Sequence, residues 1–479
     1  MNYLFRTEIK IPTLSLALLL YLVNSANAGV PAESWVQRYN SGGSDRPVKV
    51  VLDSSNDVVV TGSINGGSQV ATIKYSDSGA PLWTNDSSSL TKVTDLRLDA
   101  DNNIFITGSS PDGGTVLKYS GEGVPLWTNN YAGPSAAFLG AVVDSNDDVV
   151  VVGSSDDNDQ FVVKYSGDGT PLWTNYTTGV IGTAVAADGD GNLIALGMLS
   201  DYTGASTVKY SNDGEPLWTN VFLYPSAFGK FPGLAVFTNG DVAVSPPVGQ
   251  KTTIKISSDG ELSWTNLFYL AFGNSVTAFD DDGDVIVAGT KTSGINALMV
   301  VKYSNDGMLL WSNVFSAGAI MALAVDHDRN VIVSGTLPSR PDFGIIKFSP
   351  DGLPLSTNLY DGPSANSDRG DAVTTDGHGV IVVAGSSYES ASSSQFDFVT
   401  VKYTEQENFT FSPPSIDPEN GVSLNLSGYP GETWLIQRAT SLDGTWTNIG
   451  TVVIQTNGGG SFQDTDLPTG SGYYRAIRQ

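Results

Sequence analysis

The sequence predicts an all-β protein: an eight-bladed β-propeller closed by its own N-terminal strand and followed by a small β-sandwich. The first observation is a recurring Pro-Leu-Trp-Thr-Asn motif, whose tryptophans lie 44 to 47 residues apart. This period matches the roughly 40–45 residues of a four-stranded propeller blade. The second observation is that short apolar runs and polar turns fill each period, with no competing helical periodicity. The repeated tryptophans are Trp83, Trp127, Trp173, Trp218, Trp264 and Trp311.

Residues 141–175 show the four strands that we expect in each blade. Residues 141–144 form a first strand, and the polar turn at 145–148 leads to a second strand at Val149–Gly153. A third strand covers Phe161–Tyr165, and a Gly-Asp-Gly turn returns the chain through Pro171–Trp173. β-Branched and aromatic residues dominate these runs, as is typical of strands. The runs are apolar on both faces, which fits blades covered by a neighbour on each side.

Three repeated residues count the blades: an aspartate ends the first strand, a glycine ends the second, and a lysine lies in the third. Eight lysines define eight units, of which the fifth has Phe237 and Pro246 in place of the aspartate and glycine, and Ile256 after its lysine. The aspartates are Asp53, Asp99, Asp144, Asp188, Asp280, Asp326 and Asp376; the glycines are Gly62, Gly108, Gly153, Gly197, Gly289, Gly335 and Gly385; the lysines are Lys74, Lys118, Lys164, Lys209, Lys255, Lys302, Lys347 and Lys402.

The eighth unit lacks a fourth strand, because Val401–Tyr403 runs directly into the polar residues 404–407. A spare strand with a tryptophan, Ser34–Tyr39, lies near the start of the chain. We expect this strand to complete the eighth blade, because closing the ring removes an exposed sheet edge. The predicted propeller spans residues 29–403.

The repeated Asp…Val-Thr-Gly-Ser…Lys-Tyr-Ser…Gly…Pro-Leu-Trp-Thr-Asn pattern of residues 34–403 resembles the secreted bacterial β-propeller repeats of the SBBP type. It is more loosely similar to the tryptophan-bearing blades of quinoprotein-like propellers. The resemblance implies an extracytoplasmic scaffold or binding protein. The resemblance does not by itself imply an enzyme, because no catalytic motif defines that repeat family.

The N-terminus predicts a secretory signal peptide over residues 1–28. Arg6 and Lys10 precede an apolar run, Ile11–Val23, and the small-residue pattern Ala26-Asn-Ala28 follows it. The run is shorter than the roughly 20 residues that span a bilayer, so we expect secretion rather than membrane insertion. The expected location is extracellular or periplasmic.

The residue composition excludes some kinds of bond and disfavours some classes of binding partner. The chain has no cysteine, which excludes disulfides and thiolate metal sites. Its net charge of −26 disfavours nucleic acid as a partner. We expect a monomer without an organic cofactor.

After the propeller the composition changes. Residues 404–418 are expected to form a stiff linker that contains Ser412–Pro418, and residues 419–479 a small β-sandwich. The sandwich is similar to a reduced fibronectin type III module and to C-terminal modules of some large secreted bacterial proteins. Its expected strands are Val422–Leu426, Thr433–Arg438, Trp446–Ile454, Ser461–Gln463 and Tyr473–Ile477.

The repeated aspartate and lysine of each unit approach the same face of the ring, as Asp144 and Lys164 do in the third unit. One interpretation is a ring of charges around a pore. The favoured interpretation is an ion pair within each blade, with the long lysine stem lying along apolar surface.

In two turns, residues 188–192 and 280–284, every second residue carries a side-chain oxygen. Ca²⁺ is bound by oxygen ligands in this kind of arrangement. Neither turn supplies the twelfth-position glutamate of an EF-hand, and hairpin turns rich in Asp, Asn and Gly are the favoured alternative. We therefore expect no bound metal, with Ca²⁺ kept as the alternative. The possible ligands are Asp188, Asp190 and Asn192 in the first turn and Asp280, Asp282 and Asp284 in the second.

Catalysis has little support in the sequence. His327 and His378 are the only histidines, and no nucleophile elbow is present. A carboxylate-based glycosidase or lyase stays open, because its two acids are paired in space rather than in sequence.

Two loops that enter the fifth and sixth units are unusually aromatic. We expect six residues there to form a partly exposed patch that docks a glycan or a protein; the alternative is that they pack against neighbouring loops. The six are Phe222, Tyr224, Phe228, Phe231, Tyr269 and Phe272. Elsewhere on the ring, two loops both read Ser-Asp-Arg, at Asp45-Arg46 and Asp368-Arg369, which fits either pairing across the closing blades or ligand binding.

Together these features predict a secreted, non-catalytic binding or scaffold protein that presents a loop face to a glycan or protein. The alternative is a carbohydrate-active enzyme acting on the same face.

Overall fold

The computed structural model describes residues 31–132, 136–155, 158–223, 233–245, 251–268, 275–291, 297–316, 318–337, 343–363, 368–388, 390, 395–405, 410–417, 421–427, 433–439, 445–455, 459–466 and 473–478. The predicted signal peptide lies outside these residues. The chain divides into two compact units, of which the larger is Pro31–Thr404. Among the described residues, no helix has the length and apolar character needed to cross a membrane.

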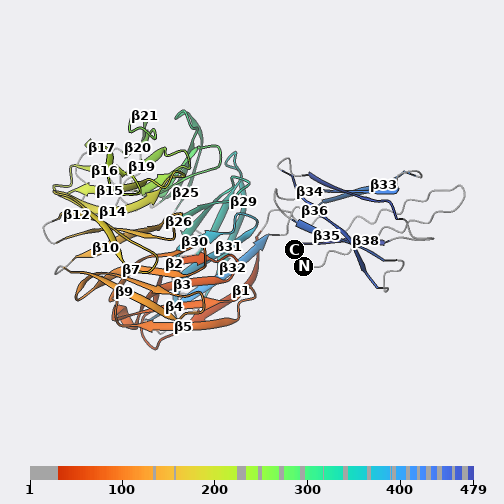
Figure 1. Cartoon of the computed structure of the whole chain (residues 1–479), viewed down its shortest axis with the longest axis horizontal. Coiled ribbons are helices and arrows are strands. Elements are labelled where there is room, and N and C mark those ends of the chain that lie inside the picture. Colours follow the sequence, from red (N-terminus) through yellow and green to blue (C-terminus); the bar gives the residue numbers. More distant parts are fainter. Residues whose placement is uncertain are drawn as a thin grey trace, which may run out of the picture. The chain divides into compact units, whose positions relative to one another are not determined.

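The larger unit is an eight-bladed β-propeller, as predicted, with eight four-stranded antiparallel sheets (Figure 1). The innermost strands are β2 (Arg46–Leu52), β6 (Lys92–Leu98), β10 (Ala137–Val143), β14 (Val180–Ala187), β18 (Gly233–Val236), β22 (Ser275–Phe279), β26 (Ala319–Val325) and β30 (Arg369–Thr375). The second strands are β3 (Val58–Ile64), β7 (Ile104–Ser110), β11 (Val149–Ser154), β15 (Leu193–Leu199), β19 (Val242–Ser245), β23 (Val285–Lys291), β27 (Val331–Thr336) and β31 (Val380–Tyr388).

The outer half of each blade carries the lysine and tryptophan motifs. The third strands are β4 (Gln69–Tyr75), β8 (Gly113–Tyr119), β12 (Gln160–Tyr165), β16 (Gly204–Tyr210), β20 (Lys251–Ile256), β24 (Ala297–Tyr303), β28 (Phe343–Phe348) and β32 (Phe396–Glu405). The outermost strands are β5 (Pro81–Ser87), β9 (Pro125–Ala132), β13 (Pro171–Thr177), β17 (Pro216–Leu223), β21 (Leu262–Phe268), β25 (Leu309–Ser316), β29 (Pro354–Tyr360) and β1 (Pro31–Tyr39).

The ring is closed by the N-terminal strand. Each innermost strand packs beside those of the two neighbouring blades, and β30 of the last blade packs beside β2 of the first. The last sheet has the order β1-β32-β31-β30, so β1 supplies the fourth strand that the eighth unit lacks. Strand β1 thus gives the eighth sheet the outer strand that the other seven sheets take from their own units.

The repeated motif holds neighbouring blades together. The Trp127 indole N–H of β9 donates to the Gly167 carbonyl of the next blade at 3.0 Å, and the Asn129 amide donates to the Gly169 carbonyl at 2.6 Å. Gly169 has a φ of +88°, and a Cβ there would lie 2.9 Å from the Trp127 ring. Seven blade-to-blade steps use this tryptophan–glycine contact, including Trp35 of β1 against Gly79 of the first blade. The Gly and Trp-Thr-Asn parts of the repeat are therefore joined across blades.

The fifth blade departs from the repeat in a way that neighbouring residues compensate. Its strands β18 and β19 have only four residues each. Phe237, which replaces the repeated aspartate, packs on Phe279 of the sixth blade with ring centres 5.4 Å apart. Asp241 supplies the missing carboxylate, 2.9 Å from Lys255.

The smaller unit contains two three-stranded sheets, with the orders β33-β34-β37 and β36-β35-β38. Buried side chains from both sheets, including Leu424 and Trp434, form one hydrophobic cluster. Five of the six strands match the expected ones, and the sixth corrects the predicted linker: Thr410–Asp417 forms β33 and pairs with β34. The register shifts between Ser412 and Ser415, so Pro413 and Pro414, which lack an N–H, fall at an irregularity in the ladder. The remaining strands are β34 (Gly421–Ser427), β35 (Thr433–Ala439), β36 (Thr447–Val453), β37 (Gly459–Asp464) and β38 (Tyr473–Arg478).

Candidate functional site

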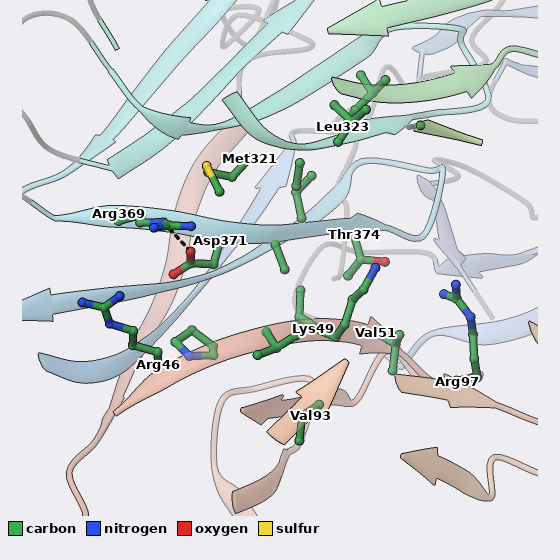
Figure 2. A pocket seen from close by; sticks show the side chains of 18 of the residues that line it. Arg46, Lys49, Val51, Val93, Arg97, Met321, Leu323, Arg369, Asp371 and Thr374 are labelled. Atoms are coloured by element: carbon green, nitrogen blue, oxygen red, sulfur yellow. Dashed lines mark ion pairs between the residues drawn. The ribbon is translucent and has the colours of Figure 1, made fainter. Parts of the chain in front are cut away.

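The candidate site is a cavity of about 790 Å³ at the axis of the propeller. It is lined by residues of six innermost strands, namely β2 and β6 of the first two blades and β18, β22, β26 and β30 of the last four. Figure 2 shows β30 with Arg369 and Asp371 between Met321 and Leu323 on one side and Arg46 and Lys49 on the other. A volume of this size is typical of sites for small ligands, which occupy roughly 300–1,000 Å³.

Three cations stand at the same structural position in three adjacent blades. Arg46, Lys92 and Arg369 are the first residues of β2, β6 and β30, and each pairs with a serine of the second strand of its blade. All three side chains are exposed. The residue at this position is Ala137 in β10 and Ala319 in β26. The positive charge is therefore confined to one arc, formed by the eighth, first and second blades.

Two further cations lie deeper along the same arc and share one carboxylate. The Arg97 guanidinium lies 3.0 Å from one oxygen of Asp95, and the Lys49 Nζ lies 3.7 Å from the other. Asp95 is buried and also accepts hydrogen bonds from the backbone N–H groups of Leu96 and Ala141. These contacts fix Asp95 in place and leave the Lys49 ammonium with unused donors that face the cavity.

Asp371 is the only carboxylate among the described lining residues. It is the extra residue of a β-bulge between Gly370 and Ala372, a feature that re-aims side chains. Arg369 Nε lies 2.6 Å from its carboxylate, and Ser386 donates to it at 3.2 Å. Burial nevertheless raises the pKa of Asp371 above its usual value, because desolvation outweighs the lowering by Arg369.

We call the five cations Arg46, Lys49, Lys92, Arg97 and Arg369 the cationic wall. Residues 31–404 contain 19 lysines and arginines, of which eight are the buried lysines of the repeat. Five of the other eleven form the cationic wall. Two carboxylates, Asp95 and Asp371, face these five cations, in a chain whose net charge is −26. The cavity is therefore locally positive within an acidic protein.

The opposite side of the cavity is uncharged. Strands β18, β22 and β26 contribute four aliphatic or thioether side chains, which we call the apolar wall: Leu234, Val276, Met321 and Leu323. Met321 is the extra residue of a bulge in β26, equivalent to Asp371 in β30. No aromatic residue lines the cavity among the described residues.

The repeated aspartate–lysine pairs are structural, as the favoured interpretation predicts. Ion pairs of 2.6–3.0 Å join the aspartate and lysine within six blades: Asp53–Lys74, Asp99–Lys118, Asp144–Lys164, Asp188–Lys209, Asp280–Lys302 and Asp326–Lys347. In the eighth blade Lys402 instead pairs with Asp77 of the first blade. All eight lysines are buried in the blades, so they do not form a charged ring around a pore.

The two predicted calcium turns are hairpin turns whose aspartates already bind lysine. Lys209 and the Asn192 side chain both donate to Asp188, and these hydrogen bonds lower the pKa of its carboxyl although burial opposes the change. In the second turn Asp280 and Asp284 both contact Lys302, and Asp282 pairs with Arg329. Asp190 donates its backbone N–H to Asp188. Among the described residues, no group of three or more acidic or histidine side chains is placed to hold a metal ion.

Of the six predicted patch residues, the structure describes only Phe222. It is half-buried and packs against the hydrophobic cluster between the fourth and fifth blades, so the patch stays a prediction. Tyr224, Phe228, Phe231, Tyr269 and Phe272 lie outside the described residues.

The two histidines lie in neighbouring turns. The rings of His327 and His378 are 4.7 Å apart, and His327 lies 3.5 Å from Asp281.

The arginines of the two Ser-Asp-Arg loops, Arg46 and Arg369, line the cavity. Asp45 is buried and accepts hydrogen bonds from Ser41 and the Asn65 N–H, whereas the adjacent Arg46 lines the cavity. Sequence reasoning noticed these loops but missed Lys92, Lys49 and Arg97. Aligning the units by their first strands would have shown a cation at the same position in units one, two and eight.

The sequence matches no protein-family model and no curated protein. Among solved structures, the chain is similar to the Dos1 propeller, with a TM-score of 0.52, 9% identity, and coverage of 78% of this chain and 94% of that one. It is also similar to the C-terminal WD40 domain of Sif2, with a TM-score of 0.55, 13% identity, and coverage of 78% of this chain and 98% of that one. At such identities the likeness establishes the fold, an all-β eight-bladed propeller built from repeats.

Proposed function

We propose that this chain is an exported, non-catalytic binding protein whose propeller takes up an anionic ligand in its axial cavity. The observation that carries the proposal is the cationic wall. Five cations converge on one cavity against two carboxylates, although acids outnumber bases two to one in the chain, at 50 to 24. Clefts lined by one sign of charge concentrate ligands of the opposite sign.

The N–H groups of the cationic wall are only partly used by carboxylates of the protein, so some are left to bind an anionic ligand. Arg46 and Lys92 form no ion pair with any described carboxylate, so both have N–H donors to offer. The two cations that are paired more tightly, Arg97 and Arg369, each use part of the guanidinium and retain further N–H groups. Guanidinium groups bind carboxylates, sulfates and phosphates with two parallel hydrogen bonds.

An enzymatic role has less support. A glycosidase needs one carboxyl to protonate the leaving group and another to act as base or nucleophile. Asp95 is engaged by three donors, and Asp371 is engaged by Arg369 and Ser386. Neither acid faces the cavity without a partner, so the non-catalytic role is preferred.

Export and surface presentation rest on the sequence of residues 1–28 and on the resemblance to secreted propeller repeats. The aromatic loops around Tyr224 and Tyr269 remain our proposed contact for a glycan or protein outside the cavity. The small unit after residue 405 is proposed to be a β-sandwich attached to the propeller.

The experiment is a binding screen with the chain from residue 29 onward, expressed without its signal peptide. An array of neutral and anionic glycans and acidic peptides is probed with the wild type and with Arg46→Glu/Lys92→Glu. We expect binding confined to anionic members and lost in the variant, with a melting temperature within a few degrees of the wild type's, because both side chains are exposed and Arg46 loses only its stacking on Phe396. Equal binding by both proteins would overturn the proposed site, and release of product from a glycan would favour the enzyme.

A further inference from the structure

The two walls of the axial cavity differ in kind, and this difference specifies the ligand beyond its charge. We propose that the cavity binds an amphipathic anion, a molecule with a single anionic head group and an unbranched aliphatic body. This inference rests on the proposed function, in which the cavity takes up an anion, and it adds the ligand class.

The head group is placed by the three cations at the starts of β2, β6 and β30. The Arg46 guanidinium lies over the ring of Phe396, 4.6 Å from its centre, so stacking uses its flat face and leaves its edge N–H groups for a ligand. Lys92 is exposed and offers an ammonium from the neighbouring blade. Arg369 is bound to Asp371 through Nε, which leaves its two terminal nitrogens. A sulfonate, sulfate or carboxylate oxygen cluster matches this arc of donors.

The aliphatic part of the proposed ligand would contact the apolar wall on the other side of the cavity. Leu234, Val276 and Leu323 are aliphatic, and each is only half-buried, so each has surface to lose to a ligand. Met321 adds an unbranched and adaptable side chain. A sugar ring would find no aromatic face among the described lining residues, whereas a saturated chain needs only apolar contact.

The test is isothermal titration of the chain from residue 29 with four probes. Decanesulfonate has both parts of the proposed ligand, methanesulfonate has the head alone, decyl maltoside has the chain with a neutral head, and hexaglutamate is an anion without an apolar body. We expect one decanesulfonate per protein, bound at least about tenfold more tightly than each other probe, because a charged hydrogen bond or a buried aliphatic segment each supplies about one factor of ten.

Two pairs of substitutions separate the walls. Arg46→Gln/Lys92→Gln removes the head contacts and should weaken decanesulfonate binding at least about tenfold, whereas Arg329→Gln, a cation in a turn outside the cavity lining, should leave it unchanged. Met321→Ser/Leu323→Ser should weaken decanesulfonate about tenfold and leave hexaglutamate binding as it was.

The outcomes distinguish this inference from the proposed function. If hexaglutamate binds as tightly as decanesulfonate and depends on Arg46 and Lys92, the cavity is an anion site but the amphipathic class is wrong. If decyl maltoside binds equally well, the head contacts are wrong. If no probe binds, both the ligand class and the proposed function are overturned. The relative affinities of the four probes for the wild-type protein decide the ligand class even where a variant fails to fold, and the variants assign the contacts to residues.

Discussion

The closure of the ring makes a prediction that can be worked out from one ion pair. Arg38 of β1 lies 2.8 Å from Asp397 of β32, and its side chain also donates to the Tyr360 hydroxyl at 2.8 Å and to Ser387 at 3.1 Å. These contacts tie the N-terminal strand to the eighth blade and to β29 of the seventh. Burial opposes the charge of Arg38, but the hydrogen bonds with Asp397 and Tyr360 outweigh it and raise the pKa of the guanidinium, so Arg38 stays charged.

We expect Arg38→Met to destabilise the propeller by about 3 kcal/mol, because it leaves the carboxylate of Asp397 buried without a counter-charge. The side chain of Asp397 is only 6% exposed, which justifies a value near that for buried pairs. Asp397→Leu should cost a similar amount by stranding Arg38. The double variant should cost about 2 kcal/mol less than the sum of the two, because it removes both charges together.

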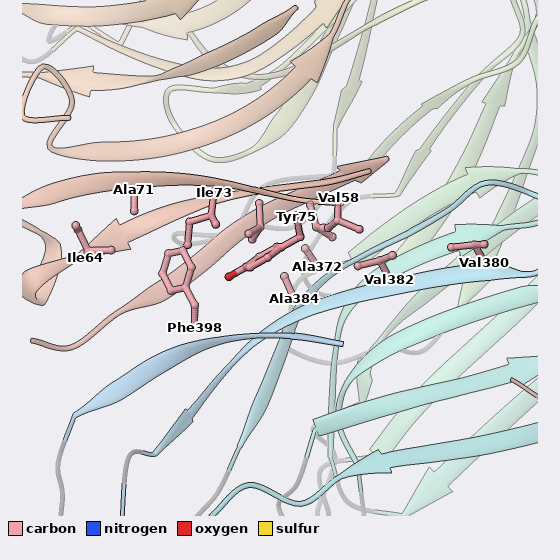
Figure 3. Close-up of a cluster of buried hydrophobic side chains, with 12 residues drawn as sticks. Val58, Ile64, Ala71, Ile73, Tyr75, Ala372, Val380, Val382, Ala384 and Phe398 are labelled. Atoms are coloured by element: carbon pink, nitrogen blue, oxygen red, sulfur yellow. The ribbon is translucent and has the colours of Figure 1, made fainter. Parts of the chain in front are cut away.

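The assay is urea unfolding followed by tryptophan fluorescence, with Arg329→Met as the control. Arg329 pairs with an aspartate that is 56% exposed, so its loss should cost under about 1 kcal/mol. The hydrophobic cluster between the first and last sheets stays intact in all variants; Figure 3 shows Ile73 and Tyr75 of the first sheet with Val382 and Phe398 of the last. Additive effects of Arg38→Met and Asp397→Leu would refute the idea that this pair locks the closing strand.

Three further predictions follow from the blades and the cavity. Gly169→Ala should cost about 2 kcal/mol more than Gly66→Ala in urea unfolding, because both have positive φ but only Gly169 faces a tryptophan ring; equal costs would contradict the blade contact. Millimolar calcium and a chelator should give the same melting temperature, because Asp188 and Asp280 already bind Lys209 and Lys302; a calcium-dependent rise would reopen the metal site. Decanesulfonate affinity should rise as the pH falls through the raised pKa of Asp371, because protonation removes a negative charge from the cavity; Asp371→Asn should bind more tightly at pH 7 and lose this dependence, and an unchanged pH profile would show that Asp371 does not face the ligand.

The propeller could be predicted from sequence because its determinants repeat. The tryptophan of the repeat contacts a glycine turn of the next blade at seven of the eight steps, so the same residues recur around the ring and the period exposes them. The missing eighth outer strand and the spare segment with Trp35 follow from the same count. Even the fifth unit fits, since Asp241 replaces the carboxylate lost at Phe237.

The cavity could not be predicted in the same way, because it depends on what does not repeat. Arg46 and Lys92 start the innermost strands of consecutive blades, but Arg369 joins them only when the ring closes between β30 and β2. The bulges that direct Met321 and Asp371 into the cavity come from ladder register, which a strand pattern does not reveal. The ion pair of Lys402 could not be predicted from the repeat either, because its partner Asp77 belongs to the next blade rather than to its own.

The axial cavity is positive within an acidic protein, and because the chain has no cysteine this local charge can be measured directly with a single introduced thiol. Thr374→Cys places a single thiol on β30 in the cavity, and Thr84→Cys places one on the exposed outer strand β5. Each variant is modified with a negatively charged and a positively charged methanethiosulfonate of similar size, at low and at high salt. We predict that the ratio of the negative to the positive reagent's rate is about tenfold higher at position 374 than at position 84, and that 1 M salt, with a screening length of about 3 Å, removes most of the difference. An equal ratio at the two positions, or faster reaction of the positive reagent at position 374, would contradict the claim.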